Sequence, residues 1–272
     1  MKLNIFDSNG IKYSGVRSDI KLYKHIDIAY DQYDFDGITL FTDQYIYSDI
    51  VDKVKSKIKI AWLLEPKVIN PNIYNISNIQ NKFDYIFTHD SNLLNLNNKY
   101  KFVPVGGCWI PGENIKIHNK TKLISHILSN KFLTENHNLR KKIYEQYNKN
   151  IDCFGGYCNP VETIDLALNE YKFSICIENC SVENYFTEKI INCFATGTVP
   201  IYCGCINIGH YFNEKGILKI KNKQDFDFLY KNINDKLYYS MLEYVKENFE
   251  KSKNYFIAED WIYLNILKYL NN

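Results

Sequence analysis

The sequence predicts an α/β protein built from two facing Rossmann-like domains. First, short apolar runs with polar ends alternate with helical or irregular stretches over residues 1–115, a pattern typical of a doubly wound parallel sheet. Second, the same alternation restarts after a polar linker with Pro and Gly near 111–122. Third, residues 171–204 read as strand, loop, helix and strand, which requires parallel strands covered by a helix. A chain of 272 residues has room for two such domains.

Six apolar runs predict the strands of the first domain, residues 1–115. They lie at 3–6, 26–30, 38–41, 57–64, 83–88 and 102–105. The run 57–64 has strong β character and stops at Glu65-Pro66, because proline ends the strand and stiffens the turn. Asp43 and the pair His89-Asp90 follow two of the other runs. The first domain therefore carries acidic side chains at several strand ends.

The second domain is expected at 120–255. Its predicted strands are 123–128, 151–154, 173–177, 199–203 and 217–220, and its predicted helices include 138–148, 161–169 and a helix that begins near Phe186 or Thr187 and is closed by Gly197. Helical sequence follows residue 220 to the C-terminus. The last helix, about 258–270 within a segment 256–272, is long enough to cross back and pack on the first domain.

The helix that Gly197 closes has one apolar and one polar face. Its apolar face holds Ile190, Ile191, Phe194 and Ala195. Glu188, Lys189 and Asn192 fall on the other face, in the first turn and a half, where backbone N–H groups are unpaired. A loop that leads from a parallel strand into a helix N-terminus is where open α/β sheets bind ligands, and Lys189 would suit a diphosphate there. The alternative is a capped surface helix with solvated charges.

Composition restricts the function further. The formal net charge of +2 gives no electrostatic footprint for nucleic acid. No apolar run resembles a signal peptide or reaches the ~20 residues that span a bilayer, so we expect a cytoplasmic protein without a transmembrane segment. The eight cysteines form no CxxC pair, and no histidine spacing suggests zinc. We therefore expect free thiols and no metal site.

The stretch 177–189, IENCSVENYFTEK, followed by GTVPIYCG at 197–204, closely resembles the donor-site motif of family 10 glycosyltransferases, the α-1,3/1,4-fucosyltransferases. Upstream, Ser129-Asn130-Lys131 and Arg140 resemble the serine-asparagine at a strand end and the helix-borne arginine of that family. The resemblance covers residues 120–220 well and the first domain only faintly. Cys203 departs from the aromatic or apolar residue that many members carry. Without the membrane anchor of the vertebrate members, the chain looks like the compact bacterial or viral ones.

The resemblance implies a GT-B type inverting transferase that moves a sugar from a nucleotide-diphosphate donor, GDP-fucose by default, to a hydroxyl of a glycan acceptor. The second domain would hold the donor and the first the acceptor, without an obligate metal or other cofactor. The expected donor-binding residues are Ser129, Lys131, Arg140, Glu178, Asn179, Tyr185, Thr187, Glu188 and Lys189. Lys189 and Arg140 would stabilise the leaving diphosphate, and Glu188 would accept from ribose or sugar hydroxyls. Tyr185 would stack on or hydrogen-bond the donor, while Glu178 would hold the loop or touch the donor.

Inversion requires a base that deprotonates the acceptor hydroxyl, and the resemblance implies a carboxylate at a strand end of the first domain. Glu65 matches this position, with Asp43 and Asp90 in reserve. His89 is expected to be a structural or acceptor-side residue. Two alternatives remain at this point: the same chemistry with another nucleotide sugar, or a non-catalytic protein that binds a nucleotide sugar or a glycan on the same fold.

Overall fold

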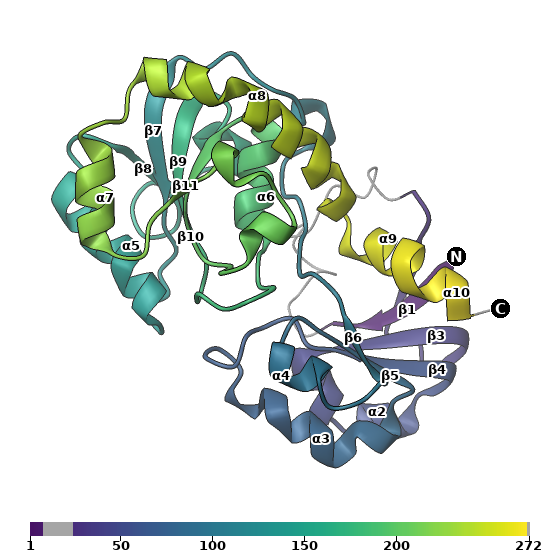
Figure 1. Ribbon diagram of the computed structural model, residues 1–272. Coiled ribbons are helices and arrows are strands. Elements are labelled where there is room, and N and C mark those ends of the chain that lie inside the picture. The colour runs from purple at the N-terminus through teal and green to yellow at the C-terminus, as the bar shows by residue number, and fades with distance from the viewer. Residues whose placement is uncertain (8–23, 271–272) are drawn as a thin grey trace. The chain divides into compact units, whose positions relative to one another are not determined.

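The computed structural model describes residues 1–7 and 24–270, and its contacts divide the chain into two compact units (Figure 1). The first unit comprises Met1–Val105, Glu183–Tyr185 and Ile257–Asn272. The second comprises Gly106–Val182 and Phe186–Phe256. The division after Val105 lies earlier in the chain than residue 115, and the short segment 183–185 groups with the first unit although its neighbours in sequence belong to the second.

The first unit contains a six-stranded parallel sheet in the order β2-β1-β3-β4-β5-β6. Its strands are β1 (Lys2–Phe6), β2 (Asp27–Tyr30), β3 (Asp34–Thr42), β4 (Lys55–Trp62), β5 (Tyr85–Thr88) and β6 (Tyr100–Phe102). Short helices connect them: α2 (Ile50–Lys53), α3 (Ile76–Ile79) and α4 (Ser91–Leu94). β4 ends at Trp62, two residues before the expected end, and β6 lies at 100–102 where 102–105 was expected.

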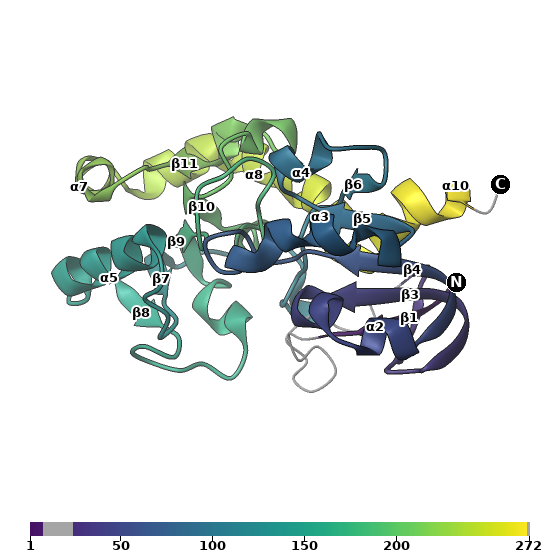
Figure 2. The ribbon, with the colours of Figure 1, turned by 90° about the horizontal axis from the view of Figure 1, so that it is seen from below.

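Both faces of this sheet are apolar, because it is covered on both sides. Ile5, Leu40 and Ile60 pack with Ala258, Ile262 and Leu267 of the C-terminal segment. Their neighbours Phe6, Phe41 and Ala61 point to the opposite face and pack against α2, α3 and α4. The C-terminal segment, α9 (Ala258–Ile262), the π-helical η10 (Tyr263–Leu267) and α10 (Lys268–Leu270), therefore packs on the first unit, as the sequence predicts. In the view from below, α2 and α3 lie in front of β3 and β4 (Figure 2).

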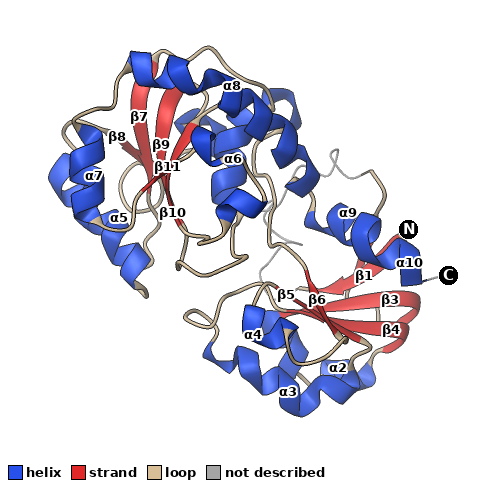
Figure 3. Cartoon of the chain, in the orientation of Figure 1, coloured by secondary structure: helices blue, strands red, loops and turns tan. Residues whose placement is uncertain are grey.

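The second unit contains a five-stranded parallel sheet in the order β11-β10-β9-β7-β8. Its strands are β7 (Lys122–Ile127), β8 (Asp152–Phe154), β9 (Tyr171–Ile177), β10 (Val199–Cys203) and β11 (Leu218–Lys219). Its helices are α5 (Glu135–Tyr147), α6 (Glu188–Thr196), α7 (Lys223–Tyr230) and α8 (Asp235–Ser252). Figure 3 shows α5 and α7 on one side of this sheet and α6 on the other. The strand order is that of a doubly wound sheet.

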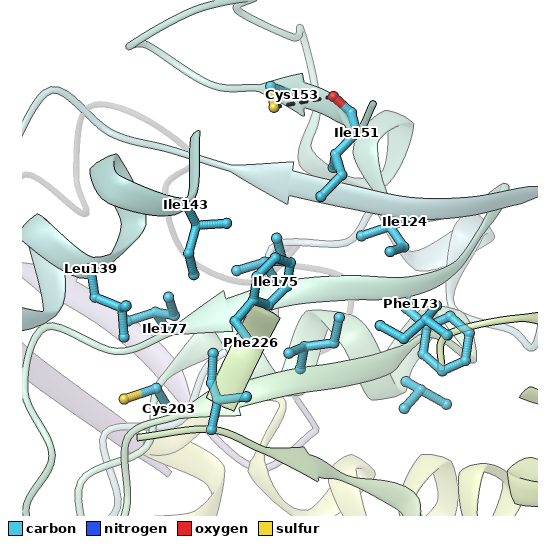
Figure 4. Close-up of a cluster of buried hydrophobic side chains, with 14 of the residues drawn as sticks. Ile124, Leu139, Ile143, Ile151, Cys153, Phe173, Ile175, Ile177, Cys203 and Phe226 are labelled. Atoms are coloured by element: carbon cyan, nitrogen blue, oxygen red, sulfur yellow. Dashed lines mark hydrogen bonds between the residues drawn. The ribbon is translucent and has the colours of Figure 1, made fainter. Parts of the chain in front are cut away.

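The core of the second unit centres on β9, whose seven residues are all buried. Phe173, Ile175 and Ile177 share one face of this strand and pack with Leu139 and Ile143 of α5 (Figure 4). Strands buried on both faces read as continuous apolar runs, which is why 173–177 is legible as a strand in the sequence. Gly197 closes α6 in the left-handed conformation, φ +75°, as its position after the apolar helix predicts.

The predicted helix 161–169 is wrong: only the 3-10 turn η6 (Ile164–Ala167) forms there. The carboxylate of Asp165 accepts hydrogen bonds from the side chains of Asn114 and Asn169, which holds the segment as a compact turn. Val, Thr, Ile, Asp and Asn also give this stretch weak intrinsic helix propensity. In the part of the chain that the structure describes, no helix combines the length and apolarity that crossing a membrane requires.

Candidate functional site

The candidate site lies at the carboxyl ends of β7 and β9, which are neighbours in the second sheet. From β7 the chain crosses to β8 on one side, and from β9 it crosses to β10 on the other. Because the two connections leave in opposite directions, this edge of the sheet is a topological switch point, the usual ligand position in doubly wound folds. The loops that follow these strands, 128–134 and 178–187, carry most of the residues that the sequence singles out.

Glu178 joins the end of β9 to the start of α6. Its side chain is fully buried, and its two carboxylate oxygens accept hydrogen bonds from the N–H and the hydroxyl of Thr187, at 2.9 and 2.7 Å. Lys189 Nζ lies 3.5 Å from the same carboxylate. Burial raises the pKa of Glu178, and the charge of Lys189 opposes that rise. Glu178 is thus the internal anchor of the loop.

Thr187 and Lys189 shape the N-terminus of α6. The Thr187 hydroxyl, which caps the helix, accepts from Lys189 N–H at 3.4 Å and from Lys189 Nζ at 3.1 Å. Lys189 Nζ also lies 3.1 Å from Glu188 Oε1, and 28% of the lysine side chain is exposed. Burial acts to lower the pKa of Lys189, but the carboxylates of Glu188 and Glu178 outweigh it and raise that pKa, so the side chain is a cation.

Gly106 and Gly107 form a turn that lies against the N-terminus of α6. Gly106 N–H donates to Phe186 O at 3.3 Å, and a side-chain carbon on Gly107 would lie 3.8 Å from Glu188 Cβ. Trp109 N–H donates to Asn192 Oδ1 at 2.8 Å. Asn192 is therefore buried and structural, not part of the exposed polar face that the helical wheel predicts.

Arg140 reaches the end of β9 from α5. Its Nε donates to the Ile177 carbonyl at 2.9 Å, its Nη2 contacts the same oxygen, and Nη2 also donates to Asn179 Oδ1 at 3.3 Å. The guanidinium is largely buried, so its charge is held in one position at the carboxyl end of β9. Arg140 and Asn179, which the sequence predicts as donor-binding residues, are therefore in direct contact.

His137 is a member of this cluster that the sequence analysis missed. It lies one helical turn before Arg140 on the same face of α5, and its Nε2 is 3.1 Å from Asn179 Oδ1. Burial first, and then the charge of Arg140, lower the pKa of His137 to about 4; Lys189 and Lys131 act in the same direction. In the sequence, the signal for this placement is that His137 stands three residues before Arg140, a spacing that puts both side chains on one face of a helix. The depressed pKa is set mainly by burial, and the cations of α5, α6 and the loop after β7 add to it.

Ser129 and Lys131 stand in that loop and are exposed. The loop ends at Thr134, whose hydroxyl caps α5 by accepting from His137 N–H at 3.1 Å. The second unit thus brings together Lys131, Arg140, Asn179, Glu178, Thr187, Glu188 and Lys189.

The contacts of Tyr185 group it with the first unit. With Glu183 and Asn184 it belongs to the first unit, where its ring packs on His89 with a centroid distance of 4.8 Å and only 2% of the residue is exposed. Ser91 donates to Glu183 Oε2 at 3.0 Å and accepts from Asn184 Nδ2 at 3.2 Å. The segment 183–185 is therefore fastened to the start of α4.

Glu65 follows β4 in the first unit and is half-buried. Its position depends on Asp43, whose Oδ1 accepts from Leu64 N–H at 3.0 Å and from Glu65 N–H at 3.4 Å. Asp43 itself is buried and has φ +36°, a left-handed conformation that aspartate adopts more readily than most residues. Asp90 caps α4 by accepting from Asn92 N–H and Leu93 N–H. Both reserve carboxylates thus have structural partners.

Among the residues that the structure describes, no group of three or more His, Cys, Asp or Glu side chains is placed to hold a metal ion.

Residues 117–262 match the family model described as glycosyltransferase family 10 (fucosyltransferase), C-terminal part. Among curated proteins, the chain is 38% identical over 60 residues to an alpha-(1,3)-fucosyltransferase of Helicobacter pylori. The aligned residues make up 22% of this chain and 13% of that protein. The chain is also 27% identical over 145 residues to human 4-galactosyl-N-acetylglucosaminide 3-alpha-L-fucosyltransferase 9. This alignment covers 48% of this chain and 39% of the relative. The chain therefore spans well under half the length of these relatives.

Two crystal structures of an alpha1,3-fucosyltransferase have a similar fold. The one with GDP has a TM-score of 0.56 at 19% identity and covers all of this chain and 92% of that one. The one with GDP-fucose has a TM-score of 0.54 at 19% identity and covers 98% and 91%. Two parallel sheets and this likeness define a GT-B type protein. Because the family model matches more than half of its residues, the chain belongs to glycosyltransferase family 10.

Proposed function

We propose that this chain is an inverting glycosyltransferase that moves a sugar from a nucleotide-diphosphate donor to a hydroxyl of a glycan. The observation that carries the proposal is the geometry at the switch point of the second sheet, where Arg140 bonds to the end of β9 and to Asn179, and Lys189 lies at the N-terminus of α6 beside Glu178 and Glu188. We favour GDP-fucose as the donor, because the crystal structures with the same fold hold GDP and GDP-fucose.

The cations would act on the leaving group. As the bond between sugar and diphosphate breaks, negative charge grows on the diphosphate, and fixed cations stabilise that charge more in the transition state than in the ground state. Lys189 is partly exposed at the N-terminus of α6, where the helix dipole adds to its effect. The Nε–Nη2 edge of Arg140 binds Ile177 O, which fixes its charge at the end of β9, where it would act on the diphosphate.

The remaining residues divide into those that touch the donor and those that hold the loop. We assign Glu188, Asn179 and Ser129 to hydroxyl groups of the ribose or the sugar. Glu178 and Thr187 are buried and bonded to each other, so we assign them to loop support. Tyr185, packed on His89, is assigned to anchoring the segment 183–185 in place of stacking on the donor.

We assign the base to Glu65. The acceptor oxygen attacks the anomeric carbon, the bond from that carbon to the diphosphate oxygen breaks, and the hydroxyl proton passes to the Glu65 carboxylate. Asp43 supports this role, because it fixes the backbone at Glu65 through two N–H groups. Asp90 caps α4 and is assigned to structure.

A nucleotide panel tests the donor site. Thermal-shift measurements with GDP, UDP, CDP and dTDP identify the preferred base, since a ligand at ~100 times its dissociation constant stabilises the protein by ~2.7 kcal/mol.

Lys189→Ala is expected to lower the affinity for the preferred nucleotide ~10- to 100-fold, the effect of losing a charged hydrogen bond. Lys246→Ala, which removes an exposed lysine on α8, is the matched control. Equal affinities of the two variants would refute the assignment of Lys189.

A transfer assay with Glu65→Gln tests the chemistry. We expect nucleotide affinity to stay within error while turnover falls ~10²- to 10⁴-fold, because only the proton acceptor is lost. If the protein binds a nucleotide sugar but neither transfers nor hydrolyses it with any acceptor in a glycan panel, it is a binding protein on the same fold. A preference for UDP, CDP or dTDP would instead change the donor and keep the chemistry.

A further inference from the structure

The side-chain amide of Asn179 is held in one orientation by two donors from α5. His137 Nε2 lies 3.1 Å from its Oδ1, and Arg140 Nη2 donates to the same oxygen at 3.3 Å. Arg140 can only donate, so the atom that it contacts must be the amide oxygen. The reverse orientation would place the NH₂ group of Asn179 against a guanidinium.

The tautomer of His137 follows from its other ring nitrogen. Nδ1 lies 3.2 Å from the N–H of Leu133, which can only donate, so Nδ1 must accept and carries no proton. The neutral ring therefore has its proton on Nε2 and donates it to Asn179. His137 is buried, and its ring is bonded at both nitrogens: to the loop after β7 on one side and to the loop after β9 on the other.

We propose that His137 is a positioning residue of the donor site, which holds the Asn179 amide in one orientation at the end of β9. The inference rests on the proposed function for the identity of the ligand. Since the oxygen and nitrogen of an amide point about 120° apart, an oxygen held towards α5 turns the NH₂ group away from it.

Charge keeps this arrangement in place. Arg140 on the same helix, Lys189 on α6 and Lys131 in the loop after β7 all oppose protonation of His137, and the hydrogen bond to Asn179 acts the other way. A second proton on Nδ1 would break the bond from Leu133 N–H. The ring thus stays a neutral donor at pH 7, and a bound diphosphate, which offsets the three cations, raises its pKa.

Calorimetry with GDP and variants of His137 tests the proposal. His137→Leu keeps an apolar body but removes the donor, and we expect GDP affinity to fall roughly five- to 100-fold because the amide of Asn179 is released. His137→Gln offers one N–H and one carbonyl oxygen in a similar place, so we expect affinity within ~3-fold of the wild type. His210→Leu is the matched control, because His210 is exposed and its Nδ1 also lies beside an asparagine, Asn207, at 3.3 Å.

Kinetics separate positioning from a general loss of structure. His137→Leu should raise KM for the donor while KM for the acceptor and the far-ultraviolet circular dichroism stay unchanged. GDP affinity of His137→Leu equal to that of the wild type would overturn the proposal. If the wild type itself binds no nucleoside diphosphate, the proposed function fails instead.

Nitrogen-15 NMR of the histidine rings supplies a readout that needs neither ligand nor a folded leucine variant. In the wild type without ligand we expect His137 in the Nε2–H tautomer with a pKa near 4. Asn179→Asp puts a carboxylate against Nε2 and should raise that pKa, while His210 stays unchanged. An Nδ1–H tautomer, or a pKa that does not respond to Asn179→Asp, would show that His137 does not hold Asn179.

Discussion

The carboxylate of Glu178 accepts both the N–H and the hydroxyl of Thr187, at 2.9 and 2.7 Å, and so ties the end of β9 to the first residues of α6. We expect Thr187→Val, which keeps the shape but removes the hydroxyl, to lower the free energy of unfolding by ~1–3 kcal/mol because a buried carboxylate loses a donor. Thr187→Ser should stay within ~1 kcal/mol. Urea unfolding measures both, and equal midpoints would show that the hydroxyl contributes nothing.

Gly204 gives Glu178 the space that it occupies. A Cβ at this position would lie 2.4 Å from Glu178 Cγ and 2.5 Å from the Tyr202 hydroxyl. Gly204→Ala should therefore displace the Glu178 side chain and weaken GDP binding, measured by calorimetry. Gly156→Ala is the control, since its Cβ would meet nothing closer than 3.5 Å. Retention of full GDP affinity in Gly204→Ala would show that the loop tolerates a displaced Glu178.

Asp43 should affect catalysis without touching the donor. Its Oδ1 holds the N–H groups of Leu64 and Glu65, so Asp43→Ala should let the Glu65 carboxylate shift and lower kcat, with little change in KM for the donor. Asp43→Asn keeps an accepting oxygen and suits the positive φ, so it should retain most of the activity. Steady-state kinetics distinguish the two, and full activity in Asp43→Ala would remove Asp43 from the mechanism.

Acid should destabilise the first unit through His89. Burial lowers the pKa of His89 to about 4, whereas the unfolded chain has its ordinary value near 6.5. Between these values the unfolded state binds a proton that the folded state does not, so stability falls as the pH is lowered from 6.5 towards 4. At pH 5 the loss is on the order of 2 kcal/mol relative to pH 7.

The same measurement on a variant isolates the contribution of His89. Urea unfolding of His89→Leu at pH 7 and pH 5 should show a smaller difference than the wild type. An identical difference would assign the acid sensitivity to other groups, of which His126 is the first candidate, because burial lowers its pKa to about 3.

Sequence alone predicts the features that depend on neighbours in the chain. The alternation of β9, α6 and β10, and the end of α6 at Gly197, follow from apolar periodicity and a helix-closing glycine, and the structure has them within a residue or two. The motif 177–189 likewise places Glu178, Glu188 and Lys189 at one helix start. Local pattern suffices here because the strand and the helix are consecutive.

Contacts between residues that are far apart in the sequence cannot be predicted from local pattern. Asp43 reads as a strand-end carboxylate, but its bonds to Leu64 and Glu65 depend on β3 and β4 lying side by side. Tyr185 follows a loop of the second domain in sequence, and its segment packs on His89 and Ser91, about 90 residues earlier in the chain. The helical wheel places Asn192 on the polar face of α6. A wheel cannot show that Trp109, from another part of the chain, donates a hydrogen bond to the Asn192 side chain.

The packing of Ala258, Ile262 and Leu267 on Leu3 and Ile5 has a consequence during synthesis. A ribosome releases β1 to β6 well before Ala258, Ile262 and Leu267, which pack on one face of their sheet. The stretch 106–256 carries its own core and can fold while the N-terminal sheet waits. The sheet that is made first is therefore expected to complete this packing last, after residue 267 has left the ribosome.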